Sequence, residues 1–144
     1  MRKTGKRRLI AAALKARLRS VSPYSRFKVG AALLTTSGKI FSGANVESAS
    51  YGLTCCAERV ALFKALSEGQ RHFAAVAIVA QVPGGPMPCG ACRQLLAEFA
   101  PAAKVWVADS RHPGAIKEFS MAELLPKAFL VVPQFPVRRT REAG

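Results

Sequence analysis

The four cysteines of this chain fall in two short segments, and these segments constrain the fold and the chemistry more than any other feature. In the first segment Cys56 is followed two residues later by Glu58, and in the second a Pro-Cys-x-x-Cys pattern supplies Cys89 and Cys92. In a chain of 144 residues, this spacing favours a metal site over a disulfide framework. Three thiolates beside a carboxylate predict a catalytic zinc site that keeps one position for water.

Other interpretations of the cysteines stay open at this point. The C-x-x-C pair by itself also suits a structural zinc knuckle or a redox pair, although a structural zinc needs a fourth ligand and no His or Cys is well spaced for it. Cys55 neighbours Cys56, but the C-x-E register favours Cys56 as the ligand and leaves Cys55 as a small buried residue. His72 and His112 lie in polar turns, which disfavours both as ligands.

Both cysteine segments lie where a loop enters an expected helix, at residues 54–66 and 90–99, with Thr54 as a plausible N-cap of the first. The positive end of a helix dipole lowers the pKa of a thiol and favours the thiolate that binds metal. Three thiolates and one divalent zinc leave a net negative site. Arg59 and Arg93 each follow a key residue directly, so we expect them to offset this charge.

The rest of the chain alternates between helical and strand patterns. A stripe of Ile10, Leu14, Leu18 and Val21 predicts an amphipathic helix over residues 6–20. The expected strands are residues 28–36, 39–44, 74–82 and 104–108, followed by a helical turn at 121–125 and an apolar return toward the body at 129–132. Small residues at 30–32 indicate close packing by another element. This order predicts an α/β fold with a sheet covered by helices on both sides.

Length and charge limit the class of protein further. The chain is long enough for one domain, residues 1–144, with basic extensions at 1–8 and 136–144. No apolar run reaches the roughly 18 residues of a membrane span, and we expect a cytoplasmic protein without a secretory leader. The net charge of +14 makes nucleic acid a partner to consider, but a solvated basic surface is the simpler interpretation.

A Cys₃ set, a carboxylate that does not bind the metal and a Pro-Cys-x-x-Cys together match the zinc deaminases, which remove ammonia from an amidine-like ring carbon. The chain resembles the small, homotetrameric cytidine deaminases of the cytidine and deoxycytidylate deaminase family. The resemblance covers most of the chain, in the right order, at residues 23–33 (Pro-Tyr-Ser-Arg-Phe-Lys-Val-Gly-Ala-Ala-Leu), 45–47, 49–52, 56–59, 88–94 and 124–129.

This resemblance implies a three-layer α/β/α sandwich around a five-stranded mixed sheet, one Zn²⁺ per subunit, and conversion of cytidine and 2′-deoxycytidine to the uridine forms in pyrimidine salvage. It implies that Cys56, Cys89 and Cys92 bind zinc and that Glu58 carries the proton. It further assigns Asn45 and Glu47 to the ribose 3′-hydroxyl, Phe27 to the base, backbone near Ala57 to the base carbonyl, and Tyr51 and Phe129 to a neighbouring subunit's pocket. Taken singly, the substrate-side residues would be ordinary core, turn or surface residues.

The sequence departs from the family pattern at Ser48, Val60 and Met87, which bear on substrate preference but not on the reaction. Three hypotheses compete: a nucleoside deaminase, a deaminase of single-stranded nucleic acid, and a zinc module without activity. Asn45 and Glu47 argue against the second, because a site that captures a 3′-hydroxyl excludes a continuing chain, and Glu58 has no purpose in the third. A variant of the first would accept an antibiotic of the blasticidin type, but the 3′-hydroxyl pair and the Phe129 segment favour a nucleoside.

Overall fold

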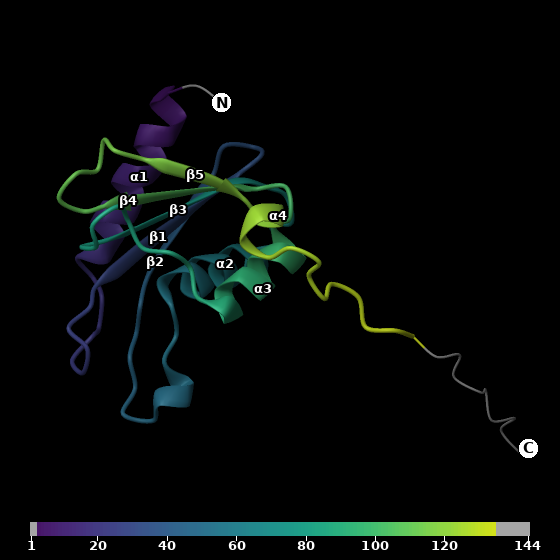
Figure 1. Cartoon of the computed structure of the whole chain (residues 1–144), viewed down its shortest axis with the longest axis horizontal. Helices are drawn as coiled ribbons and strands as arrows, with labels where there is room; N and C mark the ends of the chain where they lie inside the picture. The colour runs from purple at the N-terminus through teal and green to yellow at the C-terminus, as the bar shows by residue number, and fades with distance from the viewer. Residues whose placement is uncertain (1–2, 135–144) are drawn as a thin grey trace, which may run out of the picture.

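A mixed five-stranded sheet forms the centre of the computed structural model, which describes residues 3–134 (Figure 1). The strands are β1 (Val29–Thr35), β2 (Ile40–Ala44), β3 (Phe73–Ala80), β4 (Lys104–Asp109) and β5 (Lys117–Ser120), in the spatial order β2-β1-β3-β4-β5. Only β3 and β4 pair in parallel, and the other neighbours are antiparallel. The predicted α/β class and five-stranded mixed sheet are therefore confirmed.

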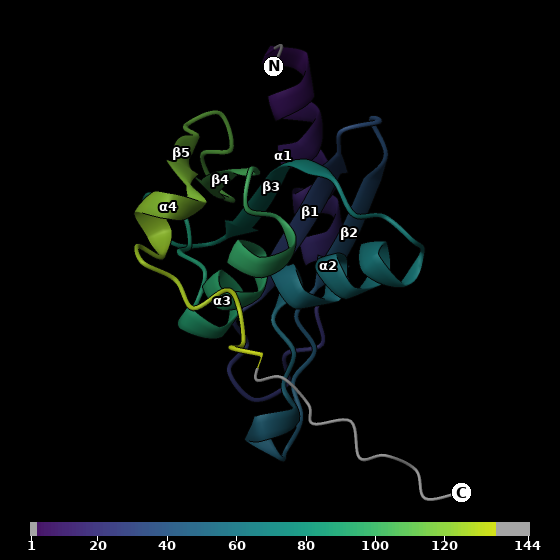
Figure 2. The ribbon, with the colours of Figure 1, turned by 90° about the vertical axis from the view of Figure 1, so that its right-hand side faces the viewer.

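Helices cover both faces of this sheet, as the two views show (Figures 1 and 2). Helix α1 (Lys3–Arg17) packs on one face, against a core cluster that includes Val79 and Trp106. Helices α2 (Ala57–Ser67), α3 (Gly90–Phe99) and α4 (Met121–Leu124) pack on the other face, against side chains such as Ile78 and Val105. The alternating side chains of the central strands supply both cores, which gives the expected three layers.

Helix α1 begins and ends earlier than the sequence predicts. Its buried side chains are Leu9, Ile10, Ala13 and Ala16. The predicted stripe is wrong beyond Leu14, because the helix ends at Arg17 and leaves Leu18 71% exposed and Val21 exposed. A side chain at Gly30 would come within 1.9 Å of the Ala13 carbonyl oxygen, so the predicted close packing over residues 30–32 is confirmed.

The chain ends fall differently with respect to the described residues. Residues 3–8, within the expected basic extension 1–8, form the first turns of α1. The expected basic extension at 136–144 lies outside the described residues.

The helices that follow the cysteine segments start at the cysteines themselves. Helix α3 occupies the predicted residues, with Cys89 as its N-cap. Helix α2 starts three residues later than predicted, because Cys56 and not Thr54 is its N-cap. The Thr54 hydroxyl instead accepts a hydrogen bond from the Ser48 backbone N–H, so it holds the preceding loop.

Two features after β4 were not predicted correctly. Strand β5 was missed because three of its four residues, Lys-Glu-Phe-Ser, are polar and exposed, so a single Phe gives no apolar alternation. The predicted apolar return at 129–132 is wrong, since all four side chains are exposed and the segment leads away from the body (Figure 1). Phe129 alone is tied back, through a 2.6 Å hydrogen bond from Gln94 Nε2 to its carbonyl oxygen.

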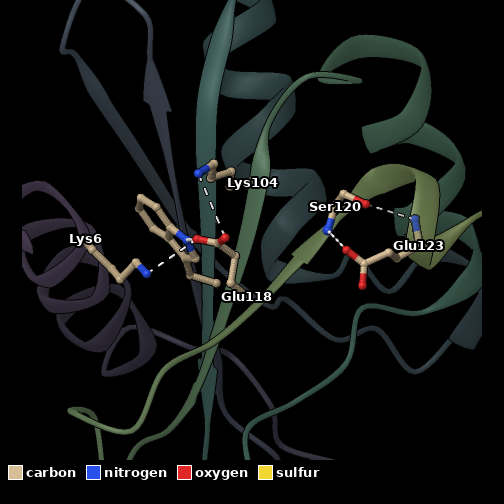
Figure 3. A network of polar contacts seen from close by, with 6 residues as sticks. Lys6, Lys104, Glu118, Ser120 and Glu123 are labelled. Atoms are coloured by element: carbon tan, nitrogen blue, oxygen red, sulfur yellow. Dashed lines mark hydrogen bonds and ion pairs between the residues drawn. The ribbon is translucent and has the colours of Figure 1, made fainter. Parts of the chain in front are cut away.

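A polar network joins α1 to the far edge of the sheet (Figure 3). Glu118 on β5 accepts a 2.7 Å hydrogen bond from the indole N–H of buried Trp106 and lies 3.5 Å from Lys6 and 3.9 Å from Lys104. The Lys6 ammonium also lies 5.1 Å from the centre of the Trp106 ring, in a cation–π arrangement. The hydrogen bond from Trp106, followed by the two lysines, lowers the pKa of Glu118, so this carboxylate stays charged.

Candidate active site

The three predicted ligands meet between the first turns of α2 and α3. The sulfur atoms of Cys56 and Cys89 are 3.8 Å apart, those of Cys89 and Cys92 are 3.4 Å apart, and all three lie within 4.8 Å of one another. Cys89 caps α3 by accepting a hydrogen bond from the Cys92 backbone N–H. Because two helix N-termini point their partial positive charges at one place, the cluster favours thiolates.

The thiol cluster fits a zinc ion. Tetrahedral zinc with Zn–S bonds of about 2.3 Å separates its sulfur ligands by roughly 3.8 Å, close to the spacing of these thiols. Within residues 3–134 no fourth His, Cys, Asp or Glu joins the cluster. The site therefore has the three protein ligands of a catalytic zinc site and not the four of a structural one.

The cysteines differ in their protonation. The interaction with the Cys92 thiol, aided by Arg59 and Cys89, lowers the pKa of Cys56 to about 5 against the opposing effect of burial. The same interaction with Cys56, together with burial, raises the pKa of Cys92. Burial also raises the pKa of Cys55, which is outside the sulfur cluster. The cluster therefore favours thiolate at Cys56, whereas Cys55 is a half-buried thiol outside it.

The two arginines lie in different environments. One Arg59 Nη2 atom donates to the Thr54 carbonyl oxygen at 3.1 Å and contacts the Cys56 sulfur at 3.5 Å, and the pKa of Arg59 is raised chiefly by this sulfur. The Arg93 guanidinium instead donates to the carbonyl oxygens of Pro88 and Leu124, at 2.8 and 2.9 Å. Arg59 therefore lies against the cluster, whereas Arg93 ties α3 to the Pro88 loop and to the end of α4.

Glu58 is buried beside the thiols, with 4% of its surface exposed, in the first turn of α2. Burial is the main cause that raises its pKa, and the charge of Cys56 acts in the same direction. The residue lines a cavity of about 210 Å³ together with the pocket-facing Cys56 and Cys89. A carboxyl group with a raised pKa at the edge of a cavity is suited to accepting and donating a proton.

The same cavity brings together three of the predicted substrate residues, Phe27, Asn45 and Ala57. The Asn45 side chain is buried and organises the loop that carries Phe27. Its Oδ1 accepts from the Val29 backbone N–H at 2.9 Å and from the Ser20 hydroxyl at 2.5 Å, and its Nδ2 donates to the Phe27 carbonyl oxygen at 2.8 Å. Phe27 itself is 42% exposed, so it forms part of the cavity wall and not of the core.

The other predicted substrate residues lie outside this cavity. Glu47 and Tyr51 line a neighbouring cavity of about 220 Å³, and Thr54 lines both cavities. Tyr51 is 77% exposed on a projecting loop, in the short 3₁₀ helix η1 (Tyr51–Leu53), where its ring stacks edge-on with that of Tyr24. Phe129 is 65% exposed and lines neither cavity. A single chain thus assembles the thiols, Glu58 and the base side, but leaves Tyr51 and Phe129 apart.

The roles of Ser25 and Thr54 in the structure were not predicted from the sequence. The Ser25 hydroxyl contacts the Glu47 carboxylate, and Thr54 separates the two cavities. Neither residue has a spacing that would single it out, since both act through partners in other segments. Met87, noted as a departure from the family pattern, lines the cavity beside Cys89. A larger cavity of about 440 Å³ at the β2 edge is lined by Val60, also noted as a departure, but by none of the predicted site residues.

A sheet between helix layers, with three thiols and a buried carboxyl at two helix N-termini, defines a zinc-dependent hydrolase of the deaminase class. The family model for the cytidine and deoxycytidylate deaminase zinc-binding region matches residues 3–108. The chain belongs to this family.

Named relatives match over most of their length. The chain is 54% identical to a cytidine deaminase of Halalkalibacterium halodurans, over 84% of this chain and 91% of that protein. It is 49% identical to a cytidine deaminase of Sporosarcina psychrophila, over 85% and 89% of the two chains. The crystal structure of a cytidine deaminase from Burkholderia pseudomallei superposes with a TM-score of 0.82 at 48% identity, covering 90% of this chain and all of the other. A blasticidin-S deaminase of Bacillus cereus is 30% identical over 71% of this chain and 76% of that protein.

Within residues 3–134, the longest helices are too short or too polar to cross a membrane.

Proposed function

We propose that this chain catalyses the hydrolytic deamination of cytidine and 2′-deoxycytidine to uridine and 2′-deoxyuridine, with release of ammonia. The observation that carries this proposal is the meeting of three thiols and buried Glu58 at the edge of one cavity. A purely structural zinc site has no need of a buried carboxyl group, whose desolvation costs free energy. The same cavity is lined by Phe27 and Asn45, which gives it an aromatic wall and a polar side.

In this proposal Cys56, Cys89 and Cys92 hold one Zn²⁺, which when bound would make water a good nucleophile near neutral pH. Glu58 takes the proton released by the attacking water and delivers it toward the departing amino group. Its raised pKa supports both tasks, because a carboxyl group that titrates closer to neutral pH can hold a proton between the two transfers. Arg59 would partly offset the negative charge of the thiolates from its place beside Cys56.

The hydrogen-bonding capacity left on Asn45 and Glu47 supports recognition of a hydroxyl group. Glu47 Oε1 already accepts the backbone N–H groups of Tyr24 and Ser25, while Oε2 accepts only the Ser25 hydroxyl and keeps one lone pair. Asn45 Nδ2 has given one of its two hydrogens to Phe27. One remaining donor and one remaining acceptor complement a hydroxyl, which both accepts and donates. We assign this pair to the ribose 3′-hydroxyl.

The remaining substrate contacts follow from the cavity wall. Phe27 would pack on the face of the pyrimidine ring, and the backbone at Ala57, the first residue of α2, would read its carbonyl oxygen. We propose that Arg93 supports the site indirectly, because its hydrogen bond to the Pro88 carbonyl oxygen holds the loop that leads into Cys89.

Deamination of single-stranded nucleic acid is the second candidate function, and the net charge of +14 is the observation that favours it. A nucleotide inside a chain has no free 3′-hydroxyl proton to donate to Glu47. Blasticidin-type substrates are a weaker alternative, because the relatives at 54% and 49% identity are cytidine deaminases, against 30% for the blasticidin-S deaminase.

We further propose that the chain works as a single domain in a homotetramer with shared active sites. Tyr51 and Phe129 support this assembly, because both are large, exposed and outside the cavity that the thiols and Glu58 line in their own chain. A cytoplasmic location is supported by four cysteines that form no disulfide with one another. In this assembly, Tyr51 and Phe129 would complete a neighbouring subunit's pocket.

The decisive experiment measures the loss of cytidine absorbance with time, together with the zinc content of the purified protein. We expect about one zinc per chain and turnover of cytidine and 2′-deoxycytidine, with far slower reaction of a cytosine inside an oligonucleotide. Faster deamination of the oligonucleotide would replace the nucleoside by nucleic acid as the substrate. Full zinc content without turnover of any of these would leave only the zinc module.

A further inference from the structure

Ser25 lies at the centre of a group of hydrogen bonds, although it has no role in the proposed chemical step. Its hydroxyl donates to Glu47 Oε2 and accepts a 3.0 Å hydrogen bond from the Phe27 backbone N–H. Its own backbone N–H and that of Tyr24 both donate to Glu47 Oε1 at 3.1 Å. One side chain therefore joins the carboxylate assigned to the sugar with the backbone of the aromatic residue assigned to the base.

We propose that Ser25 is a positioning residue that anchors the Glu47 carboxylate to the backbone at Phe27, so that Glu47 is held where the sugar hydroxyl would bind. This inference rests on the proposed nucleoside function. Ser25 lines the cavity next to the one that Cys56, Cys89 and Glu58 line. Its effect is therefore expected on substrate binding and selectivity, not on the metal.

The backbone between these residues gives independent support. Arg26, between Ser25 and Phe27, has a φ of +58°, a left-handed conformation that is unfavourable for a residue with a side chain. Such a conformation persists only where the surrounding contacts enforce it. The contacts on either side of Arg26 are the Ser25 bonds to Glu47 and the Asn45 bond to the Phe27 carbonyl oxygen, with a further bond from the Arg26 N–H to the Ser22 carbonyl oxygen.

The charge of Glu47 makes this group of hydrogen bonds directional. The Ser25 hydroxyl and backbone lower the pKa of Glu47, so the carboxylate is ionised at neutral pH and acts only as an acceptor. Ser25 must then point its proton at Glu47, which leaves its lone pairs for the Phe27 N–H. The group of hydrogen bonds thus has one orientation, and its free end is the lone pair on Glu47 Oε2 that the substrate hydroxyl would take.

The test compares cytidine with 3′-deoxycytidine in the wild type and in Ser25→Ala. We expect Ser25→Ala to lower kcat/KM for cytidine about tenfold, mostly through KM, because a hydrogen bond to a charged group is lost. The reaction of 3′-deoxycytidine should change much less, since it makes no use of Glu47. The preference of the enzyme for the free 3′-hydroxyl should therefore shrink by nearly the same factor, with unchanged zinc content. Ser25→Thr keeps the hydroxyl and should restore most of the preference.

Ser67→Ala is the matched control, since Ser67 is also exposed and its hydroxyl donates to one carbonyl oxygen at the far end of α2. Equal losses for both nucleosides in Ser25→Ala would mean that Ser25 serves the loop as a whole, which overturns its action through Glu47. An unchanged Ser25→Ala enzyme would overturn the proposal altogether. If the wild type neither binds nor deaminates cytidine, the proposed function itself fails. If the wild type is active and only the Ser25→Ala comparison fails, the proposed function stands and the role of Ser25 is wrong.

Discussion

The two halves of the candidate site are built in opposite ways. The thiols and Glu58 come from the first turns of two helices, lie close to the core and are fixed by short-range spacing in the sequence. The sugar side is an exposed loop held by hydrogen bonds between residues about 20 positions apart, such as Ser25 with Glu47 and Phe27 with Asn45. The chemical half is held by packing, whereas the recognition half is held mainly by polar contacts.

This difference predicts how each half responds to substitution. Removing one ligand from a three-ligand site abolishes it, because no other described residue can replace a thiol. Removing one hydrogen bond from the loop weakens binding by a limited amount, because the other bonds remain. The predictions below test this contrast, from the largest expected effect to the smallest.

The largest effect is expected for Cys92→Ser. Cys92 is fully buried in the sulfur cluster, and serine has nearly its shape but no thiolate. We expect loss of bound zinc and a fall in kcat/KM of more than about a thousandfold, since a catalytic metal contributes several kcal/mol. Metal analysis and the cytidine assay measure both. Cys55→Ser is the matched control, and a loss of zinc in that variant would show that the wrong one of the two adjacent cysteines was assigned.

Glu58→Gln should keep the zinc and lose most of the activity. The amide preserves the shape of the side chain in its buried site, but it cannot accept and return a proton. We expect kcat to fall by roughly 10²–10⁴, with little change in metal content. Full activity with zinc bound would refute the assignment of Glu58 as the proton carrier and would place the chemical step on another group.

Asn45→Ala tests the recognition half at its most buried point. The substitution removes the partners of the Val29 N–H and the Phe27 carbonyl oxygen, so we expect unfolding to become easier by about 2 kcal/mol. The KM for cytidine should rise as well, while the zinc content stays constant. Urea unfolding and steady-state kinetics measure these effects. Ser20→Ala is the milder comparison, because it removes a hydroxyl that donates to Asn45 Oδ1 and leaves the Val29 and Phe27 bonds in place. A loss of stability equal to that of Asn45→Ala would contradict the importance of those two backbone bonds.

The same contrast explains how much of the site the sequence could predict. The C-x-E and C-x-x-C spacings predict that the three thiols meet and that Glu58 lies at the same cavity, as observed, because one helical turn fixes the direction of each side chain. The hydrogen bonds of Ser25 to Glu47 and of Thr54 to Ser48 could not be predicted, because the partners lie in other segments and no local pattern marks them.

The fold shows the same limit. Helix α3 and the buried strand β3 were predicted well, since periodicity and continuous apolar character are local signals. The polar strand β5 carries no such signal and exists because it pairs with β4. The exposed Phe129 segment was misjudged because apolar side chains alone do not say whether their partner is the same chain.

The smallest effect is expected outside both halves, at Glu118, which contacts Trp106 and Lys6 on the α1 side of the sheet (Figure 3). Its pKa is lowered in the folded chain by Trp106 and the two lysines, so its charge stabilises the fold above its unfolded pKa of about 4.3. This stabilisation is lost as the pH falls through the lower folded pKa.

Glu118→Gln should therefore destabilise the chain at pH 7 by less than about 1 kcal/mol, as expected for exposed ion pairs, with a smaller difference near pH 3. Denaturant unfolding at the two pH values measures this, and unchanged cytidine kinetics would show that the α1 face acts only as a support. A large loss of activity in Glu118→Gln would instead mean that the α1 side of the sheet affects the active site, and that the activity does not depend on the two halves of the site alone.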